Sequence, residues 1–414
     1  MRALAAAARD ASLVLANADT ATKNALLAAL ADGLLRDRAA ILAANGADVA
    51  AAREAGLTAA MIDRLALDEK RLAAVADAVL RIATLPDPVG RVEWQARRAD
   101  GVEIGRMRVP LGVVAMIYES RPNVTIDAAS LCLKSGNAAI LRGGSEALRT
   151  NRALAATLAA ALATVGLPPG CATLVPTTDR SDLLELLKLD QLVDLVIPRG
   201  GEGLIRFVAE HSRIPVIRHY KGVCHLYVDA DADVELASRL LIDGKTSRPG
   251  VCNALETLLV DERAVARFLP LARRALLDRD VALRACPRAQ QWLPESIPAT
   301  PEDWDAEYLD LVLAVRVVDG LDGAIAHIAK HGSKHTEVIA TNDPAKAERF
   351  LREVDASAVM WNASSRFNDG GELGLGAEIG ISTTKLHAYG PMGLESLTTQ
   401  KFVLRGTGQT RHAV

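Results

Sequence analysis

The sequence predicts an α/β protein made of two parallel-sheet domains, and three observations support this fold class. The chain has 414 residues, more than one ordinary hydrophobic core holds. Half of these residues are hydrophobic, which is enough to fill two large cores. From Gly101 onward, short β-rich runs alternate with helical segments, as in a parallel sheet covered by helices on both faces. We therefore expect two α/β domains with the site between them.

The first 85 residues or so are predicted to be helical. Apolar residues recur there at helical spacing with charges between them, as at Leu27, Leu30, Leu34, Ile41 and Leu42. After the prolines at 86 and 88, we expect a β-hairpin near residues 95–112, and then strands over 113–118, 137–141, 172–175, 192–197 and 216–218. Helices are expected over 126–134 and 151–165.

A second α/β run is predicted to begin near His225. Its strands are expected over 226–228, 257–260, 312–317, 338–340 and 358–361, with helices that include 265–277 and 322–330. The polar tail from Gly390 is β-like and of a kind that commonly pairs with another chain. These signals divide the chain into domains over 1–225 and 226–385 and a small β appendage for oligomerisation over 386–414.

Composition excludes several classes of protein. With 48 Lys and Arg against 51 Asp and Glu and only 3% aromatic residues, the chain shows neither a polyanion-binding charge nor stacking platforms for nucleic acid. Arg9 and Asp10 interrupt the N-terminal apolar run too early for a signal peptide. The apolar stretch 153–167 is too short to span a bilayer. The five cysteines show no metal-binding spacing, so we expect a reduced, cytoplasmic protein without a metal. They are Cys132, Cys171, Cys224, Cys252 and Cys286.

Cys252 is the first candidate for catalysis. It lies in GKTSRPGVCNALETLLV, where Pro249 and Gly250 bend the chain before a predicted strand. A cysteine on such a bend can present its sulfur to a substrate and its own N–H to a developing oxyanion. Lys245 and Arg248 are close in sequence and could favour the thiolate. The alternative is a buried cysteine in a loop.

Two segments that follow predicted strands are candidates for binding phosphate. Arg142, Ser145 and Glu146 follow the strand 137–141; Arg and Ser suit a phosphate, and Glu suits ribose hydroxyls. The alternative is a solvated, charged turn. Gly200 and Gly201, in PRGGEG, open a predicted helix, where glycine lets the backbone approach a phosphate. This segment does not match the GxGxxG pattern.

Asn123 and Glu307 have weaker local signals. The Asn123 amide, after YESRP, could donate to an oxyanion, although a turn or helix-capping asparagine is the common alternative. Glu307 lies in DAEYLDLVLAV just before a strand, where a lone carboxylate is usually only solvated. His211, His219 and His225 form no recognisable metal spacing.

Taken in order, six segments resemble the aldehyde dehydrogenase superfamily along nearly the whole chain. The closest resemblance is to its gamma-glutamyl phosphate reductase branch, also called glutamate-5-semialdehyde dehydrogenases. The segments are VPLGVVAMIYESRPNVT, SGNAAILRGGSEALRTN, LVIPRGGEGL, HYKGVCHLYVD, DGKTSRPGVCNALETLLV and GPMGLESLTTQKFVLRG. Each alone is modest, but their joint order and spacing are specific.

The resemblance implies roles for several of these residues. Cys252 matches the nucleophile of the superfamily. Arg142, Ser145 and Glu146 occupy the stretch where aldehyde dehydrogenases show Lys-Pro-Ser-Glu and hold the adenosine ribose. Arg142 with Ser145 would suit a 2′-phosphate, which favours NADPH as the cofactor of the first domain.

The nicotinamide end, the oxyanion amide and the water-activating position also have counterparts. Glu307 aligns with the second Glu of the Glu-Glu-Ile-Phe-Gly-Pro segment that holds the nicotinamide ribose, and Leu309 replaces its Phe. Asn123 stands in Arg-Pro-Asn where relatives have Pro-Trp-Asn, with a shorter spacing to the segment after it. The Glu that activates water in hydrolytic relatives falls on His219, which suits an enzyme that passes its thioester to hydride or phosphate. His219 could itself act as a base.

The implied reaction is the NADPH-dependent reduction of L-glutamyl 5-phosphate to L-glutamate 5-semialdehyde and phosphate through a thioester, the second step of proline synthesis from glutamate. Lys245 or Arg248 would contact the phosphate. Ser364 and Arg366 in NASSRFND, or Glu119 and Arg121, would contact the amino acid end; surface solvation is the alternative for all four. A homo-oligomer and an association with glutamate 5-kinase are the expected partners.

Two rival functions remain. A hydrolytic, NAD-linked aldehyde dehydrogenase would share the fold, but the absence of Glu at 219 and the charged loop before Cys252 count against it. A non-catalytic binding or structural protein would not need Cys252, Glu307 and the Arg142 segment together.

Overall fold

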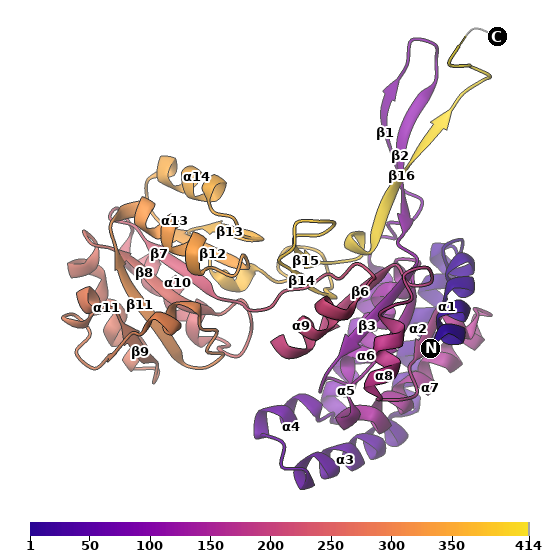
Figure 1. Ribbon diagram of the computed structural model, residues 1–414, viewed down its shortest axis with the longest axis horizontal. Helices are drawn as coiled ribbons and strands as arrows, with labels where there is room; N and C mark the ends of the chain where they lie inside the picture. Colours follow the sequence, from indigo (N-terminus) through magenta and orange to yellow (C-terminus); the bar gives the residue numbers. More distant parts are fainter. Residues whose placement is uncertain (413–414) are drawn as a thin grey trace. The chain divides into compact units, whose positions relative to one another are not determined.

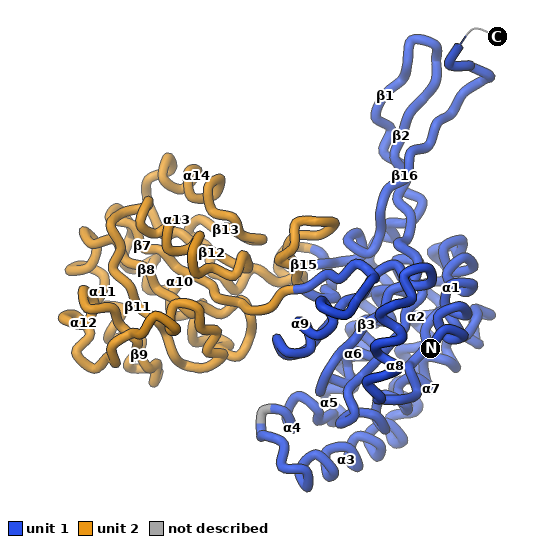
Figure 2. The backbone as a smooth tube through the Cα atoms, in the orientation of Figure 1, with its two compact units in different colours: residues 1–218, 375–380, 392–414 blue, residues 219–374, 381–391 orange. Residues whose placement is uncertain are grey.

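The computed structural model describes residues 1–412, except for the side chain of Ala60. The chain forms two compact units (Figure 2). Unit 1 comprises Met1–Arg218, Leu375–Gly380 and Met392–Val414, and unit 2 comprises His219–Gly374 and Ile381–Pro391. The sequence predicted domains over 1–225, 226–385 and 386–414; here unit 2 begins at His219, and the end of the chain divides between unit 2 (Ile381–Pro391) and unit 1 (from Met392).

Unit 1 begins with the predicted helices. They are α1 (Arg2–Leu15), α2 (Thr20–Arg36), α3 (Arg38–Glu54), α4 (Ala59–Leu65) and α5 (Glu69–Thr84). Side chains of the residues before α2, α4 and α5 accept hydrogen bonds from the first helical turn, which satisfies N–H groups that the helix itself leaves unpaired. These residues are Asp19, Thr58 and Asp68.

The sheet of unit 1 is parallel, with strand order β5-β4-β3-β6. Figure 1 labels β3 and β6 of this sheet. Its strands are β3 (Val113–Tyr118), β4 (Ala138–Arg142), β5 (Ala172–Leu174) and β6 (Leu195–Arg199). The helices between and after them are α6 (Asn123–Lys134), α7 (Leu148–Thr164), α8 (Arg180–Leu186) and α9 (Glu202–His211), with short 3-10 turns η1 (Ser145–Ala147) and η2 (Pro169–Cys171). The order reverses between β3 and β6, so the carboxyl ends of these two strands flank the point where open α/β sheets bind ligands.

One predicted strand of unit 1 is wrong. Residues 216–218 form no strand; Val216 makes a single parallel bridge to Val196 in β6. Pro215 precedes it and has no N–H to extend the ladder. The strand predicted over 192–197 begins later, at Leu195, and the helix predicted over 126–134 begins earlier, at Asn123.

A three-stranded antiparallel sheet with order β1-β2-β16 completes unit 1. The hairpin of β1 (Val92–Arg97) and β2 (Glu103–Pro110) confirms the one predicted near 95–112. The tail strand β16 (Thr398–Arg405) follows η5 (Glu395–Leu397) and pairs with β2 of its own chain, from Thr398 opposite Pro110 to Arg405 opposite Glu103. Trp94, Phe402 and Leu404 on this sheet are exposed.

Unit 2 is built on a seven-stranded parallel sheet with order β10-β9-β11-β8-β7-β12-β13. Its strands are β7 (Cys224–Val228), β8 (Leu255–Asp261), β9 (Ala282–Ala285), β10 (Ile297–Pro298), β11 (Val312–Val318), β12 (Thr336–Ala340) and β13 (Ala358–Trp361). The helical segments are α10 (Val234–Thr246), α11 (Val265–Leu277), α12 (Pro287–Gln290), η3 (Pro301–Asp305), α13 (Gly320–His331), α14 (Pro344–Glu353) and η4 (Ser365–Phe367). Two short strands, β14 (Gly380–Ser382) and β15 (Gly390–Met392), pair separately. The two α/β units confirm the predicted fold class.

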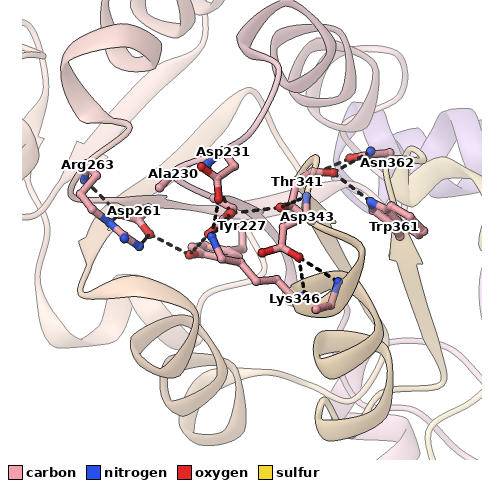
Figure 3. Close-up of polar contacts among 12 residues, drawn as sticks. Tyr227, Ala230, Asp231, Asp261, Arg263, Thr341, Asp343, Lys346, Trp361 and Asn362 are labelled. Carbon is pink, nitrogen blue, oxygen red and sulfur yellow. Dashed lines mark hydrogen bonds and ion pairs between the residues drawn. The ribbon is translucent and has the colours of Figure 1, made fainter.

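The carboxyl edge of the unit 2 sheet carries a buried polar cluster (Figure 3). The Tyr227 hydroxyl lies 3.0 Å from Asp229 Oδ1 and 3.1 Å from Asp261 Oδ2, and all three side chains are buried. Lys346 Nζ donates to Asp229 Oδ2 at 2.7 Å, and the Arg263 guanidinium donates to Asp261 Oδ2 at 2.8 Å. Because these charged groups bind one another, the cluster ties the ends of β7 and β8 together.

No helix among residues 1–412 is long and apolar enough to cross a membrane.

Candidate active site

Cys252 lies in the turn immediately before β8, at the amino edge of the unit 2 sheet. Of the five cysteines, all within the described residues, it alone is partly exposed; the other four are buried. Burial raises the pKa of the thiols of Cys132 and Cys171, to about 12 and about 11, which makes them poor nucleophiles. Cys252 is therefore the cysteine whose position allows it to meet a substrate.

The backbone of Cys252 contacts the segment that leads into β7. The Cys224 thiol donates a hydrogen bond of 3.1 Å to the carbonyl oxygen of Cys252. Gly222 lies so close that a Cβ at this position would stand 2.0 Å from the same oxygen, so only glycine fits. The N–H of Gly222 in turn donates to Glu307 Oε1 at 2.9 Å. Gly222 thus links Glu307 to the turn that carries Cys252.

A buried ion pair lies beneath this turn. Lys245 Nζ is 2.7 Å from Glu256 Oε2, and neither side chain is exposed to solvent. Glu256 Oε1 accepts a hydrogen bond of 3.1 Å from the N–H of Leu309, which has a positive φ of 54°. Burial raises the pKa of Glu256 to about 7, although Lys245 acts to lower it, and burial lowers the pKa of Lys245. Lys245 was expected to contact the substrate phosphate; in this structure its ammonium is enclosed with Glu256.

Arg248 lies between α10 and Cys252 in the sequence. Unlike that of Lys245, its side chain is exposed. Ser364 and Arg366 are the two other expected substrate residues of unit 2. Their loop is bonded to the turn that carries Cys252, because Asn253 Nδ2 donates to the carbonyl oxygen of Asn368 at 3.1 Å. Ser364 is buried, and its hydroxyl accepts a hydrogen bond of 3.3 Å from the N–H of Arg366. Of Ser364 and Arg366, the half-buried Arg366 is better placed to reach a ligand.

His219 is half-buried, and its Nδ1 lies 3.0 Å from the carbonyl oxygen of Ile381. A carbonyl oxygen only accepts, so Nδ1 carries the proton and Nε2 is the acceptor nitrogen. The ring of His335 stands edge-on at 5.8 Å, and burial lowers the pKa of His335 to about 3, so it is neutral.

In unit 1, the expected residues lie at the carboxyl ends of β3, β4 and β6. Glu119 follows β3, and its Oε2 accepts a hydrogen bond of 3.0 Å from the N–H of Gly201 at the start of α9. A Cβ at Gly200 would lie 2.3 Å from the same oxygen. The helix N-terminus expected to receive a phosphate thus holds the carboxylate of Glu119, which was expected to contact the amino acid substrate.

The residues after β4 are arranged around Ser120 and Thr178. Glu146 Oε1 accepts from the Ser120 hydroxyl at 2.8 Å, while Ser145 is exposed. Arg142 Nη2 donates to the carbonyl oxygen of Thr178 at 2.7 Å. The Nε of Arg142 is buried and has no hydrogen-bond partner among the described residues. A half-buried guanidinium whose Nε has no partner among the described residues fits an anionic group such as a cofactor phosphate.

Asn123 is the first residue of α6 and is half-buried, and Arg121 before it is exposed. One N–H of the Asn123 amide donates to Asp127 Oδ2 at 2.8 Å, one turn further along the helix. Burial raises the pKa of Asp127 to about 6, against the effect of this hydrogen bond and of the Arg199 charge. The second N–H of the amide is the one that could serve an oxyanion.

Comparisons with known proteins place this geometry in a family. The model of the "Aldehyde dehydrogenase family" matches residues 1–281, which is more than half of the chain. The chain belongs to the aldehyde dehydrogenase family. It is 59% identical to the gamma-glutamyl phosphate reductase of Xanthomonas axonopodis pv. citri over 100% of both chains, and 60% identical to that of Salinibacter ruber over 100% of this chain and 94% of the relative. The crystal structure of the Thermotoga maritima gamma-glutamyl phosphate reductase superposes with a TM-score of 0.97 at 45% identity, covering 99% of each chain. Both resemblances stated from the sequence are confirmed.

Two elements of this aldehyde dehydrogenase site are not predicted by the sequence. Glu256 is hidden in a continuous apolar strand pattern, although a carboxylate inside β8 requires a partner. Gly222 and Cys224 lie in HYKGVCH, where the close backbone approach to Cys252 was not predicted. Gly222 itself was the available clue, since a glycine often marks a point where two backbones meet.

Proposed function

We propose that this chain reduces L-glutamyl 5-phosphate to L-glutamate 5-semialdehyde and phosphate, with NADPH as reductant, in the synthesis of proline. The observation that carries the proposal is the position of Cys252 as the one partly exposed cysteine, in a turn at the edge of the sheet. The names of relatives that are about 60% identical over the whole chain supply the substrate.

In the proposed reaction, the Cys252 thiolate attacks the γ-carbonyl carbon. A carbon–sulfur bond forms, the carbon–oxygen bond to phosphate breaks, and the phosphate leaves near the exposed guanidinium of Arg248. The backbone N–H of Cys252 and the second N–H of the Asn123 amide are the proposed oxyanion donors. The nicotinamide supplies a hydride to the thioester carbon when it is bound. Collapse of the resulting hemithioacetal releases the aldehyde and restores the thiolate.

We assign the cofactor contacts to side chains whose donor or acceptor groups can bind parts of the cofactor. Arg142 and Ser145 would hold the 2′-phosphate, which distinguishes NADPH from NADH. Glu307 would hold the nicotinamide ribose, with its position set by the N–H of Gly222. Glu146, whose Oε1 already binds Ser120, would use its other oxygen for the adenosine ribose. Gly200 and Gly201 remain a proposed phosphate contact only if Glu119 moves away from the N–H of Gly201.

Three further proposals concern the surroundings of the enzyme. All five cysteines are free, which supports a reducing, cytoplasmic location. The exposed Trp94, Phe402 and Leu404 on the β1-β2-β16 sheet support a homo-oligomer formed through it. An acyl phosphate is reactive toward water, which supports an association with the glutamate 5-kinase that would make it.

The reverse reaction tests the proposal. Glutamate 5-semialdehyde and NADP should give NADPH only when phosphate is present, because no carboxylate stands at position 219 to activate water. Glutamate should then accumulate slowly or not at all. Rapid, phosphate-independent formation of glutamate would instead favour the hydrolytic rival and assign the water-activating role to Nε2 of His219.

If His219→Glu confers hydrolysis, position 219 faces the thioester. If that variant only loses stability, residue 219 serves a structural role through its hydrogen bond to Ile381.

A further inference from the structure

Unit 2 has a second candidate site, in a cavity of about 320 Å³ formed by the end of β11, by α13 and by α12. The side chains that matter for its chemistry are Arg288, Arg316, Asp319, His327, Lys330 and His331. None of them is among the residues discussed above for catalysis or for cofactor binding. The cavity is at the small end of the range for ligand sites, so it suits a small molecule.

The charges in this cavity do not balance. Arg288 forms an ion pair with Asp319, and His331 Nδ1 lies 2.9 Å from Asp305 Oδ1. Arg316 and Lys330 have no carboxylate within ion-pair distance anywhere in residues 1–412. Two cations thus face one small cavity without a counter-ion from the described chain, which is unfavourable for the half-buried Arg316.

Arg316 is also held in a fixed orientation. Its guanidinium carbon lies 5.3 Å from the centre of the Trp304 ring, in a cation–π arrangement. Its Nη1 donates to His327 Nδ1 at 3.1 Å. An arginine that is stacked and hydrogen-bonded in this way keeps its remaining N–H groups oriented for an anion at little entropic cost.

His327 adds a neutral donor. Because arginine can only donate, His327 Nδ1 is the acceptor and the ring proton is on Nε2. The pKa of His327 is lowered to about 2, mainly by burial, so the ring stays neutral. Smaller contributions come from the neighbouring His225, Arg316, His331 and Lys330. The side chain is 5% exposed, and its Nε2 has no hydrogen-bond partner among the described residues. A buried N–H without a partner is a costly feature that a bound acceptor would relieve.

We propose that this cavity binds a phosphate group, either as free phosphate or as a small phosphate monoester, through Arg316, Lys330 and the Nε2–H of His327. Two unpaired cations match the charge of a phosphate dianion, and a planar guanidinium suits two of its oxygens at once. The site is separate from the one proposed for the reaction and does not depend on that function.

The test is calorimetric titration of the full-length protein with inorganic phosphate and, separately, with glycerol 3-phosphate. The variants are Arg316→Gln and Lys330→Gln, with Arg273→Gln as the matched control, because Arg273 is a paired surface arginine of the same unit outside the cavity. We expect saturable binding to the wild type, at least about tenfold weaker binding to both cavity variants, and no change in the control. Tighter binding of the monoester would identify a phosphorylated metabolite as the occupant; tighter binding of inorganic phosphate would identify the free ion.

Two results would overturn the proposal. One is binding to Arg316→Gln and Lys330→Gln that equals that of the wild type, since all phosphate would then be bound elsewhere. The other is an equal loss in Arg273→Gln, which would show a general effect of surface charge. If Arg316→Gln does not fold, Lys330→Gln decides alone, because Lys330 is exposed on the surface of α13.

Discussion

Replacing Lys245 by methionine distinguishes a structural role for this residue from a role in binding substrate. The Lys245→Met change removes the ammonium 2.7 Å from Glu256 Oε2 and leaves a carboxylate that is 0% exposed. Removal of one partner of a buried ion pair costs about 3–5 kcal/mol of unfolding free energy. The pKa of Glu256 is already about 7, so the carboxyl takes up a proton at modest cost, and we expect a loss at the lower end, about 3 kcal/mol.

The assay is equilibrium urea unfolding at pH 7, with the slope of the transition compared between variants. The double variant Lys245→Met/Glu256→Gln is the control. Its amide keeps an oxygen for the N–H of Leu309 but carries no charge, so it should recover at least about 1 kcal/mol. A loss below about 1 kcal/mol in Lys245→Met together with a raised KM for glutamyl phosphate would refute the reasoning. Lys245 would then face the substrate, as its place in the sequence suggested.

Three further substitutions test other parts of the site and fold. Cys252→Ser should lower the rate on the order of 1000-fold or more while NADPH still binds, measured by single-turnover kinetics and by cofactor fluorescence. Arg142→Ala should weaken NADPH roughly 10- to 100-fold and NADH by less than about twofold, and Arg142→Lys should recover part of the NADPH affinity; equal losses for both cofactors would contradict the assignment. Tyr227→Phe should cost about 1–3 kcal/mol in urea unfolding at pH 7, because the hydroxyl between buried Asp229 and Asp261 is lost. Burial acts to raise the pKa of Asp229 and Asp261, but their hydrogen bonds hold the pKa of each carboxyl below its ordinary value, so the stabilisation from this cluster should be full above about pH 4 and be lost as the pH drops through the folded values.

Continuous apolar strands and strongly periodic helices could be predicted closely. The strands Val113–Tyr118 and Ala358–Trp361 and the helix Val265–Leu277 have the predicted limits. The strands β9 and β10 were not predicted, because four and two residues are too few to show a period. The same limit explains the wrong strand at 216–218, where three residues with β-propensity make one bridge only.

The position of Lys245 could have been predicted from the helix that carries it. Ala237 and Leu241 are buried on α10, and Lys245 follows at the next step of four residues, on the same buried face. A lysine on such a face needs a buried acidic partner, and Glu256 in the next strand was the nearest candidate. The closeness of Lys245 to Cys252 in the sequence predicts the position of its side chain less well. The period of the helix sets the direction in which each of its side chains points.

The candidate site residues of the two units lie at opposite edges of their sheets. In unit 1 the candidate cofactor residues follow β3, β4 and β6, at the carboxyl ends where ligands of open α/β sheets usually bind. In unit 2 the candidate residues precede strands: Cys252 precedes β8, Gly222 precedes β7, and Glu307 and Leu309 precede β11. The carboxyl edge of that sheet is instead filled by Tyr227 and its charged partners, which satisfy one another (Figure 3). A residue just before a strand has a backbone N–H that need not join the ladder, and an oxyanion requires such a donor. At the amino edge of this sheet, a cysteine can therefore be both the attacking group and a hydrogen-bond donor.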